Sequence, residues 1–164
     1  MNIERAAFLL AMKAHKHQRY GDDPYMVHLF DVVGVLHRFG HDEEEMLAVA
    51  WLHDIIEDTP MNYNDVKVAC GDGVADVVLA LTDEIGKNRR ERKVKTLPKI
   101  KGNLWAQTVK LADWIANVTN AIEEKPKLLQ MYHKDFPSFA EALGDEFSEL
   151  MPMRHCLASL LEEM

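Results

Sequence analysis

Leu52-His53-Asp54-Ile55-Ile56-Glu57-Asp58-Thr59 is the stretch of sequence that decides how this chain folds. It follows an almost wholly apolar segment, residues 46–52, and a helix that is apolar on every side belongs inside a protein. A buried imidazole or carboxylate must be paired, hydrogen-bonded or bound to a metal, because an unpaired buried charge costs roughly several kcal/mol. The sequence therefore predicts a polar centre inside the core at His53 and Asp54.

The composition is that of a water-soluble globular protein. Of the 164 residues, 48% are hydrophobic and 28% are charged, and no apolar run approaches the roughly 20 residues of a membrane span. The N-terminus lacks the basic start and apolar core of a signal peptide, and two cysteines indicate no disulfide framework. We expect one domain, 1–164, that works in the cytoplasm and contacts no membrane.

The charge is unevenly distributed along the chain. The net charge of −8 argues against binding to a long nucleic acid, yet residues 87–101 contain eight basic residues and a single acid. A local basic stretch on an acidic protein suits a small polyanion, although a solvated, mobile loop would have the same composition. The sequence leaves open whether the chain forms a homodimer.

The hydrophobic periodicity is helical throughout, and no alternating run is long enough to predict a strand. Pro24 suits the first position of a helix, and Gly40 suits a helix C-terminal cap. We expect an all-α, single-domain helical bundle. The expected helices are about residues 3–19, 25–39, 42–59, 64–70, 73–82, 91–101, 104–124, 127–134 and 145–163.

Three of these expected helices carry metal-ligand side chains among apolar neighbours. His28 lies in the second helix, His53 and Asp54 end the third, and Asp113 lies in the long helix 104–124. Two imidazoles and two carboxylates suit Mn²⁺ or another divalent transition metal, with positions left open for water and substrate oxygens. Spacing alone does not join His28 to Asp113.

At these positions the chain resembles the HD-domain phosphohydrolases, whose ligands follow the order H…HD…D. Within that superfamily it is most similar to the hydrolase domain of RelA/SpoT-type alarmone enzymes and to their free-standing small relatives, the metazoan SpoT homologues. HDxxEDT with PYxxH upstream and KLAD downstream is far more specific than a bare HD pair. The matching pieces lie in about residues 3–120 and are Ala14-His15-x-x-Gln18-Arg19, Pro24-Tyr25-Met26-Val27-His28, residues 50–59, Leu81-Thr82-Asp83, and Val109-Lys110-Leu111-Ala112-Asp113 with Asn117. Residues 121–164 are expected to be a helical C-terminal extension.

The resemblance implies a role for each matching position. Glu57 and Asp58 would activate and orient the attacking water, and each follows a ligand by four residues, so one helix would place each beside its ligand. The implied metal ligands are His28, His53, Asp54 and Asp113. The implied substrate contacts are Arg19, which stacks on the guanine base in this family, and Asn117, to which we add Arg89, Arg90 and Lys93 for the outer phosphates.

The implied activity is Mn²⁺-dependent hydrolysis of the 3′-pyrophosphate of (p)ppGpp, which gives GDP or GTP and pyrophosphate. The chain departs from the family pattern at Tyr20, Leu29 and Trp114 and in the Gly21 spacing of the PY loop, and the resemblance places these sites at the border of the nucleotide pocket. They leave open an HD-type phosphohydrolase acting on an adenine nucleotide or another pyrophosphorylated nucleotide. A non-catalytic nucleotide sensor or antitoxin-like partner is a third alternative, but a pure binder needs no base such as Glu57 beside its metal.

Overall fold

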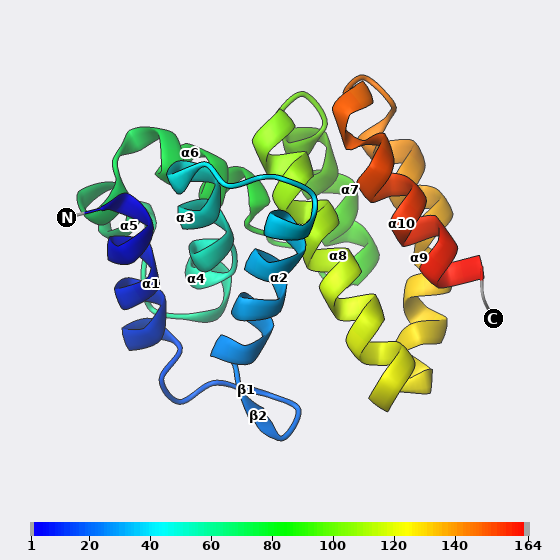
Figure 1. Cartoon of the computed structure of the whole chain (residues 1–164), viewed down its shortest axis with the longest axis horizontal. Helices are drawn as coiled ribbons and strands as arrows, with labels where there is room; N and C mark the ends of the chain where they lie inside the picture. Colours follow the sequence, from blue (N-terminus) through cyan, green and yellow to red (C-terminus); the bar gives the residue numbers. More distant parts are fainter. Residues whose placement is uncertain (1, 163–164) are drawn as a thin grey trace.

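The structure is a computed structural model that describes residues 2–162, and it is helical almost throughout (Figure 1). The first half contains α1 (Ile3–Ala14), α2 (Met26–Arg38), α3 (Glu44–Leu52), α4 (Ile55–Asp58), α5 (Tyr63–Cys70) and α6 (Asp72–Leu81). The second half contains α7 (Arg89–Ile100), α8 (Leu104–Glu124), α9 (Pro126–Leu143), the short 3₁₀ turn η1 (Ser148–Leu150) and α10 (Met151–Glu162). These elements confirm the predicted all-α class.

Strand structure in the described part of the chain is confined to one small hairpin between α1 and α2. Its strands, β1 (Arg19–Tyr20) and β2 (Asp23–Pro24), pair in antiparallel fashion. None of the helices in residues 2–162 combines the length and the apolar character that a membrane crossing needs.

Asparagine caps define where several helices begin. The side chains of Asn2, Asn88 and Asn103 each accept the backbone N–H of the residue three positions later. Asn62 and Asp65 form a reciprocal capping box at the start of α5. These caps satisfy N–H groups that the first turn of a helix leaves without a partner.

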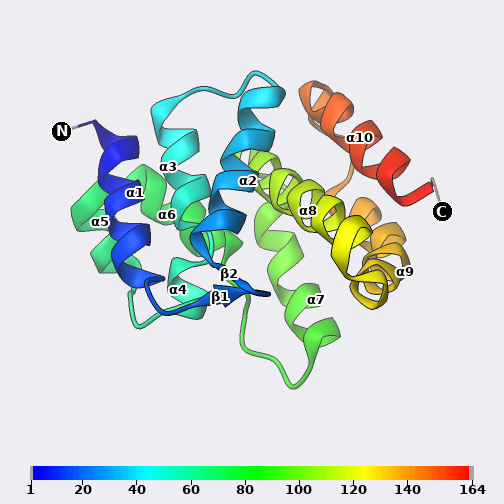
Figure 2. The same ribbon diagram turned by 60° about the horizontal axis from the view of Figure 1, so that its bottom comes forward.

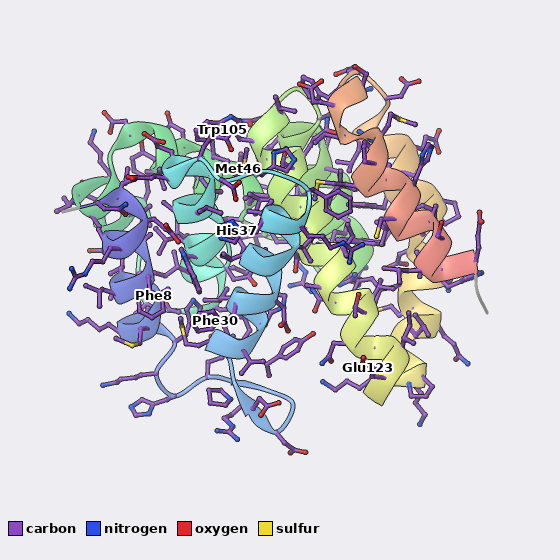
Figure 3. All side chains as sticks on the ribbon, in the orientation of Figure 1. Phe8, Phe30, His37, Met46, Trp105 and Glu123 are labelled. Atoms are coloured by element: carbon purple, nitrogen blue, oxygen red, sulfur yellow. The ribbon has the colours of Figure 1, made fainter. Side chains whose placement is uncertain are left out.

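Helices α2 and α8 pack against each other through the centre of the molecule, with further helices on either side and α6 in contact with α7 (Figures 1 and 2). Helices α1, α3, α5 and α6 lie on one side, and α7, α9 and α10 lie on the other. Phe8 of α1 and Phe30 of α2, which Figure 3 labels, point toward each other. Both pack edge-on against Trp51 of α3, with ring centroids about 5 Å apart. This aromatic cluster joins α1 and α3 to α2, the helix that carries His28.

Helix α3 lies inside the core, as its sequence predicts, but the single helix expected over residues 42–59 was wrong. Helix α3 ends before His53, and Asp54 leaves helical geometry with φ −104° and ψ 0° before α4 begins. The Nδ1 of His53 donates to the carbonyl of Ala50 at 2.8 Å, so a side chain occupies an acceptor that would continue the helix. The N–H of Asp58 still donates to the carbonyl of Asp54, which keeps those two residues one turn apart.

The C-terminal helices also differ from the expected boundaries. Helix α9 runs to residue 143 instead of 134, because Pro137 is tolerated inside a helix whose following turns bury Phe139 and Leu143. The last helix begins at Met151 instead of about residue 145. Pro152 lies in its first turn, where the missing N–H costs no helical hydrogen bond.

Candidate metal and catalytic site

The predicted metal ligands come together from α2, the turn between α3 and α4, and α8. One ligand atom from each of His28, His53 and Asp113 lies within 4.8 Å of the other two. The Nε2 of His28 is 3.3 Å from Oδ1 of Asp113, and the Nε2 of His53 is 3.8 Å from the same oxygen. Asp54 joins the cluster with Oδ2 at 3.0 Å from Nε2 of His53. Tertiary packing therefore unites residues that sequence spacing could not join.

The cluster fits a divalent cation. His28 and His53 are each 2% exposed, and Asp113 is 6% exposed. Because the Nδ1–H of His53 is donated to a backbone carbonyl, its Nε2 is left facing the carboxylates, buried and without a hydrogen-bond partner. Two imidazoles with carboxylates are a donor set that manganese, iron and zinc accept. The chemistry of these residues supports a metal site without selecting the metal.

Neighbouring charges shift the pKa values of the cluster. Burial by itself would raise the pKa of Asp113, but the Lys110 ammonium, 2.8 Å from its Oδ2, and the two imidazoles hold that pKa well below its usual range. Burial would lower the pKa of His53, but the carboxylates of Asp54 and Asp113 raise it to about 9. The same pairing with His53 lowers the pKa of Asp54 against the effect of burial. Both carboxylates are thus ionised and attract a cation.

A second group of side chains orients the predicted metal ligands. The hydroxyl of Tyr25 donates to Oδ2 of Asp54, and the amide of Asn117 donates to Oδ1 of Asp113 at 2.6 Å. Tyr20 donates to Asn117 at 2.9 Å and stacks on the ring of His28. Tyr25 and Lys110 belong to the PYxxH and KLAD motifs, but only the structure indicates their roles beside Asp54 and Asp113. Asn117, predicted to contact the substrate, contacts a ligand in the structure.

Glu57 and Asp58 lie on α4, next to the turn that carries two ligands. Oε2 of Glu57 accepts the backbone N–H of Asp83 at 3.0 Å, and Oδ2 of Asp58 accepts the side-chain amide of Gln18 at 2.8 Å. Burial is the largest cause that raises the pKa of each carboxyl above its ordinary value. A carboxylate with a raised pKa accepts a proton more readily near neutral pH.

Most of the basic stretch 87–101 is ordered as α7, not as a loop. Lys93 lies 3.2 Å from Asp83, the residue whose N–H donates to Glu57, so α7 is joined to the acidic pair through one residue. Arg89 forms a 3.0 Å ion pair with Asp135 of α9. Two of the three predicted phosphate-binding residues, Arg89 and Lys93, therefore already form ion pairs with carboxylates.

A cavity of about 640 Å³ lies between α7 and α9. Arg89, Arg90 and Lys93 contribute to one wall, and Trp114 and Phe139 contribute aromatic surface. The two aromatic rings stack with centroids 3.8 Å apart. Trp114 immediately follows Asp113 in α8, but the side chains of His28, His53, Asp54 and Asp113 do not line this cavity.

Arg19 is a predicted substrate contact that lies neither in the cluster nor in the lining of the cavity. It is exposed on β1, and its guanidinium donates to the carbonyl of Asp22 within the hairpin. Its neighbour Tyr20 contacts the cluster instead. Stacking of Arg19 on a guanine base stays a prediction.

The sequence profile of the HD domain family matches residues 7–144. The chain belongs to the HD domain family. The resemblance deduced from the separated His, His-Asp and Asp ligands is thereby confirmed.

Relatives of this HD domain include enzymes of guanosine 3′,5′-bis(diphosphate) metabolism. The guanosine-3′,5′-bis(diphosphate) 3′-pyrophosphohydrolase MESH1 of Danio rerio is 33% identical over 130 residues, which are 72% of this chain and 71% of that protein. The bifunctional (p)ppGpp synthase/hydrolase SpoT of Escherichia coli K12 is 41% identical over 75 residues, 45% of this chain. That match spans only 10% of the length of SpoT.

Solved structures share the fold. A metazoan orthologue of SpoT that hydrolyses ppGpp superposes with a TM-score of 0.84 at 21% identity, over 99% of this chain and 96% of that one. A Listeria monocytogenes EGD-e protein superposes with a TM-score of 0.69 at 29% identity, over 85% of this chain and 94% of its own. The first likeness, at this low identity, establishes the architecture alone.

Proposed function

We propose that this HD domain is a metal-dependent pyrophosphohydrolase that removes the 3′-pyrophosphate of (p)ppGpp. Water adds to phosphorus, the bond between the 3′ oxygen and phosphorus breaks, and GDP or GTP leaves with pyrophosphate. The observation that carries the proposal is the convergence of His28, His53 and Asp113 within 4.8 Å, with Asp54 and the acids of α4 alongside. The similarity to MESH1 over most of both chains supports the substrate.

We assign His28, His53, Asp54 and Asp113 to hold the cation, which we propose to be Mn²⁺. A divalent ion, when bound there, polarises a phosphate oxygen and makes water more acidic. Asn117 and Lys110 hold the carboxylate of Asp113 in place from two sides. This arrangement keeps a buried ligand fixed while the substrate binds.

Glu57 is assigned as the general base and Asp58 as the residue that orients the attacking water. One oxygen of Glu57 is held by the N–H of Asp83, and the remaining oxygen is assigned to take the proton. The raised pKa of Glu57 favours that transfer, and a general base of this kind typically contributes about 10²–10⁴-fold in rate.

The cavity between α7 and α9 is assigned to the rest of the nucleotide. Arg90 and Lys93 lie on its wall, where their charges suit the outer phosphates, together with Arg89. Trp114 and Phe139 supply an apolar surface beside these cations. Arg19 is assigned to the guanine base and Asn117 to a further substrate contact, both from the family resemblance.

A panel of nucleotides with Mn²⁺ tests the proposal, with products separated by chromatography. Pyrophosphate released only from 3′-pyrophosphorylated guanosine would support it. Release from the adenine counterpart instead would favour an HD-type phosphohydrolase that acts on adenine nucleotides. Two departures from the family pattern support this alternative, because Tyr20 stacks on His28 and Trp114 lines the cavity. Tight binding of nucleotide with no turnover of any compound, under conditions where Mn²⁺ is bound, would refute hydrolysis and indicate a sensor.

We also propose that the protein acts in the cytoplasm. Cys70 and Cys156 are both free thiols, which suits a reducing compartment.

A further inference from the structure

A chain of two hydrogen bonds leads from the core to Asp58. The Nδ1 of His15 lies 2.6 Å from Oε1 of Gln18, and the side-chain N–H of Gln18 donates to Oδ2 of Asp58 at 2.8 Å. His15 follows the last residue of α1 and is only 2% exposed. Neither His15 nor Gln18 has a part in the function proposed above.

The acceptor at the end of the chain fixes the direction of every hydrogen bond in it. An ionised carboxylate such as that of Asp58 can only accept, so Gln18 must turn its NH₂ group toward Asp58. Its carbonyl oxygen then faces His15, which must donate from Nδ1. Turning the amide of Gln18 over would place two oxygens 2.8 Å apart and lose both bonds.

The surroundings of His15 hold its ring in the orientation that this donation needs. The ring stacks on Tyr25 with centroids 4.8 Å apart, and Tyr25 in turn donates to Asp54. The Nε2 of His15 is buried and has no hydrogen-bond partner, which is tolerable for a lone pair and costly for an N–H. Burial also lowers the pKa of His15, which favours a neutral ring with one proton.

We propose that His15 and Gln18 are positioning residues that orient Asp58 for the hydrolytic reaction. By engaging Oδ2 of Asp58, Gln18 directs the other carboxylate oxygen toward the water, and His15 prevents the amide of Gln18 from turning over. This inference rests on the proposed hydrolase function, because it assigns a use to the carboxylate of Asp58.

Paired substitutions at His15 separate the donated hydrogen bond from the packing of the ring. His15→Phe keeps an aromatic ring against Tyr25 and loses the donor. His15→Asn loses the ring but keeps an N–H close to the position of Nδ1. Gln18→Leu removes the next bond in the chain, and Gln18 is not buried in the core, so its replacement spares the packing.

We expect kcat to fall about 10- to 100-fold in His15→Phe and in Gln18→Leu, with KM and bound manganese unchanged, because misplaced groups cost rate on this scale. His15→Asn should retain kcat within a few fold although it melts at a lower temperature than His15→Phe. The double variant His15→Phe/Gln18→Leu should be no slower than either single one, since both break the same chain. Loss of kcat that follows melting temperature across the variants would overturn the proposal.

A second measurement does not depend on turnover. The ¹⁵N spectrum of the histidine rings should show His15 as the neutral Nδ1–H form, and Gln18→Leu should alter the signal of that proton. An Nε2–H form would overturn the positioning role, whatever the enzyme hydrolyses. Wild-type protein inactive on every nucleotide would instead refute the proposed function, and normal kcat in His15→Phe would refute only the positioning role.

Discussion

Lys110→Met should destabilise the metal-free protein far more than the metal-bound protein. The Nζ of Lys110 lies 2.8 Å from Oδ2 of Asp113, with the two side chains 13% and 9% exposed. Without Lys110 and without a metal, Asp113 loses its nearest cation inside the core. With a divalent cation bound, another positive charge faces the same carboxylate.

The size of the effect follows from the burial of this ion pair. Removing one partner of a buried pair costs about 3–5 kcal/mol, because it leaves a buried charge uncompensated. In a protein of this size, 1 kcal/mol corresponds to roughly 2–4 °C, so the melting temperature should fall by roughly 6–20 °C in a chelator. Saturating Mn²⁺ should remove more than half of that deficit, because the bound ion supplies a positive charge beside the carboxylate that Lys110 no longer compensates.

Thermal unfolding in EDTA and in excess Mn²⁺ measures both quantities. Lys67→Met is the matched control, because Lys67 pairs with Asp72 at the same 2.8 Å while the side chains are 46% and 65% exposed. An exposed pair contributes at most about 1 kcal/mol, so the control should change little in either condition. If Lys110→Met lowers the melting temperature equally in EDTA and in Mn²⁺, the ammonium of Lys110 does not compensate the charge of the proposed metal ligands.

Further predictions concern the proposed site. Asp54→Asn and Asp113→Asn should each lose bound manganese by elemental analysis, and a full complement of metal in both would refute the ligand assignment. Glu57→Gln should bind manganese normally and lose about 10²–10⁴-fold in kcat; normal hydrolysis would exclude Glu57 as the base. Since burial raises the pKa of Glu57, kcat of the wild type should fall as the pH drops through that raised pKa, at a higher pH than for an exposed glutamate. A pH–rate profile with the same acidic limb in Glu57→Gln would assign that limb to another group. Arg90→Ala should raise KM for (p)ppGpp with less effect on kcat, because Arg90 lines the cavity assigned to the nucleotide. An unchanged KM would show that Arg90 does not bind the substrate.

Local sequence patterns were sufficient for the all-α class and for the chemical types in the site. The apolar segment 46–52 predicted a buried helix, and every residue in it is at most 4% exposed. HDxxEDT, PYxxH and KLAD pointed to the predicted metal ligands through their resemblance to the HD-domain family, and each motif also has apolar residues in or beside it. These are properties of short stretches, so one sequence is enough to show them.

The break in the helix at His53 was not predictable from the same patterns. The helical spacing of Glu57 and Asp58 suggested a continuous helix, whereas His53 bonds the carbonyl of Ala50 and the chain turns before α4. A side chain that competes for a backbone acceptor leaves no periodic signal.

The sequence by itself determined that this chain is an all-α protein with imidazoles and carboxylates placed among apolar residues in three separate segments. Only the tertiary structure decided that His28 and Asp113 share one centre, that Lys110 neutralises Asp113, and that Gln18 reaches Asp58. Helical periodicity states which face of a helix is buried, but not which other helix it meets. Those pairings depend on how all the helices pack together, and that packing brings distant residues within hydrogen-bond distance.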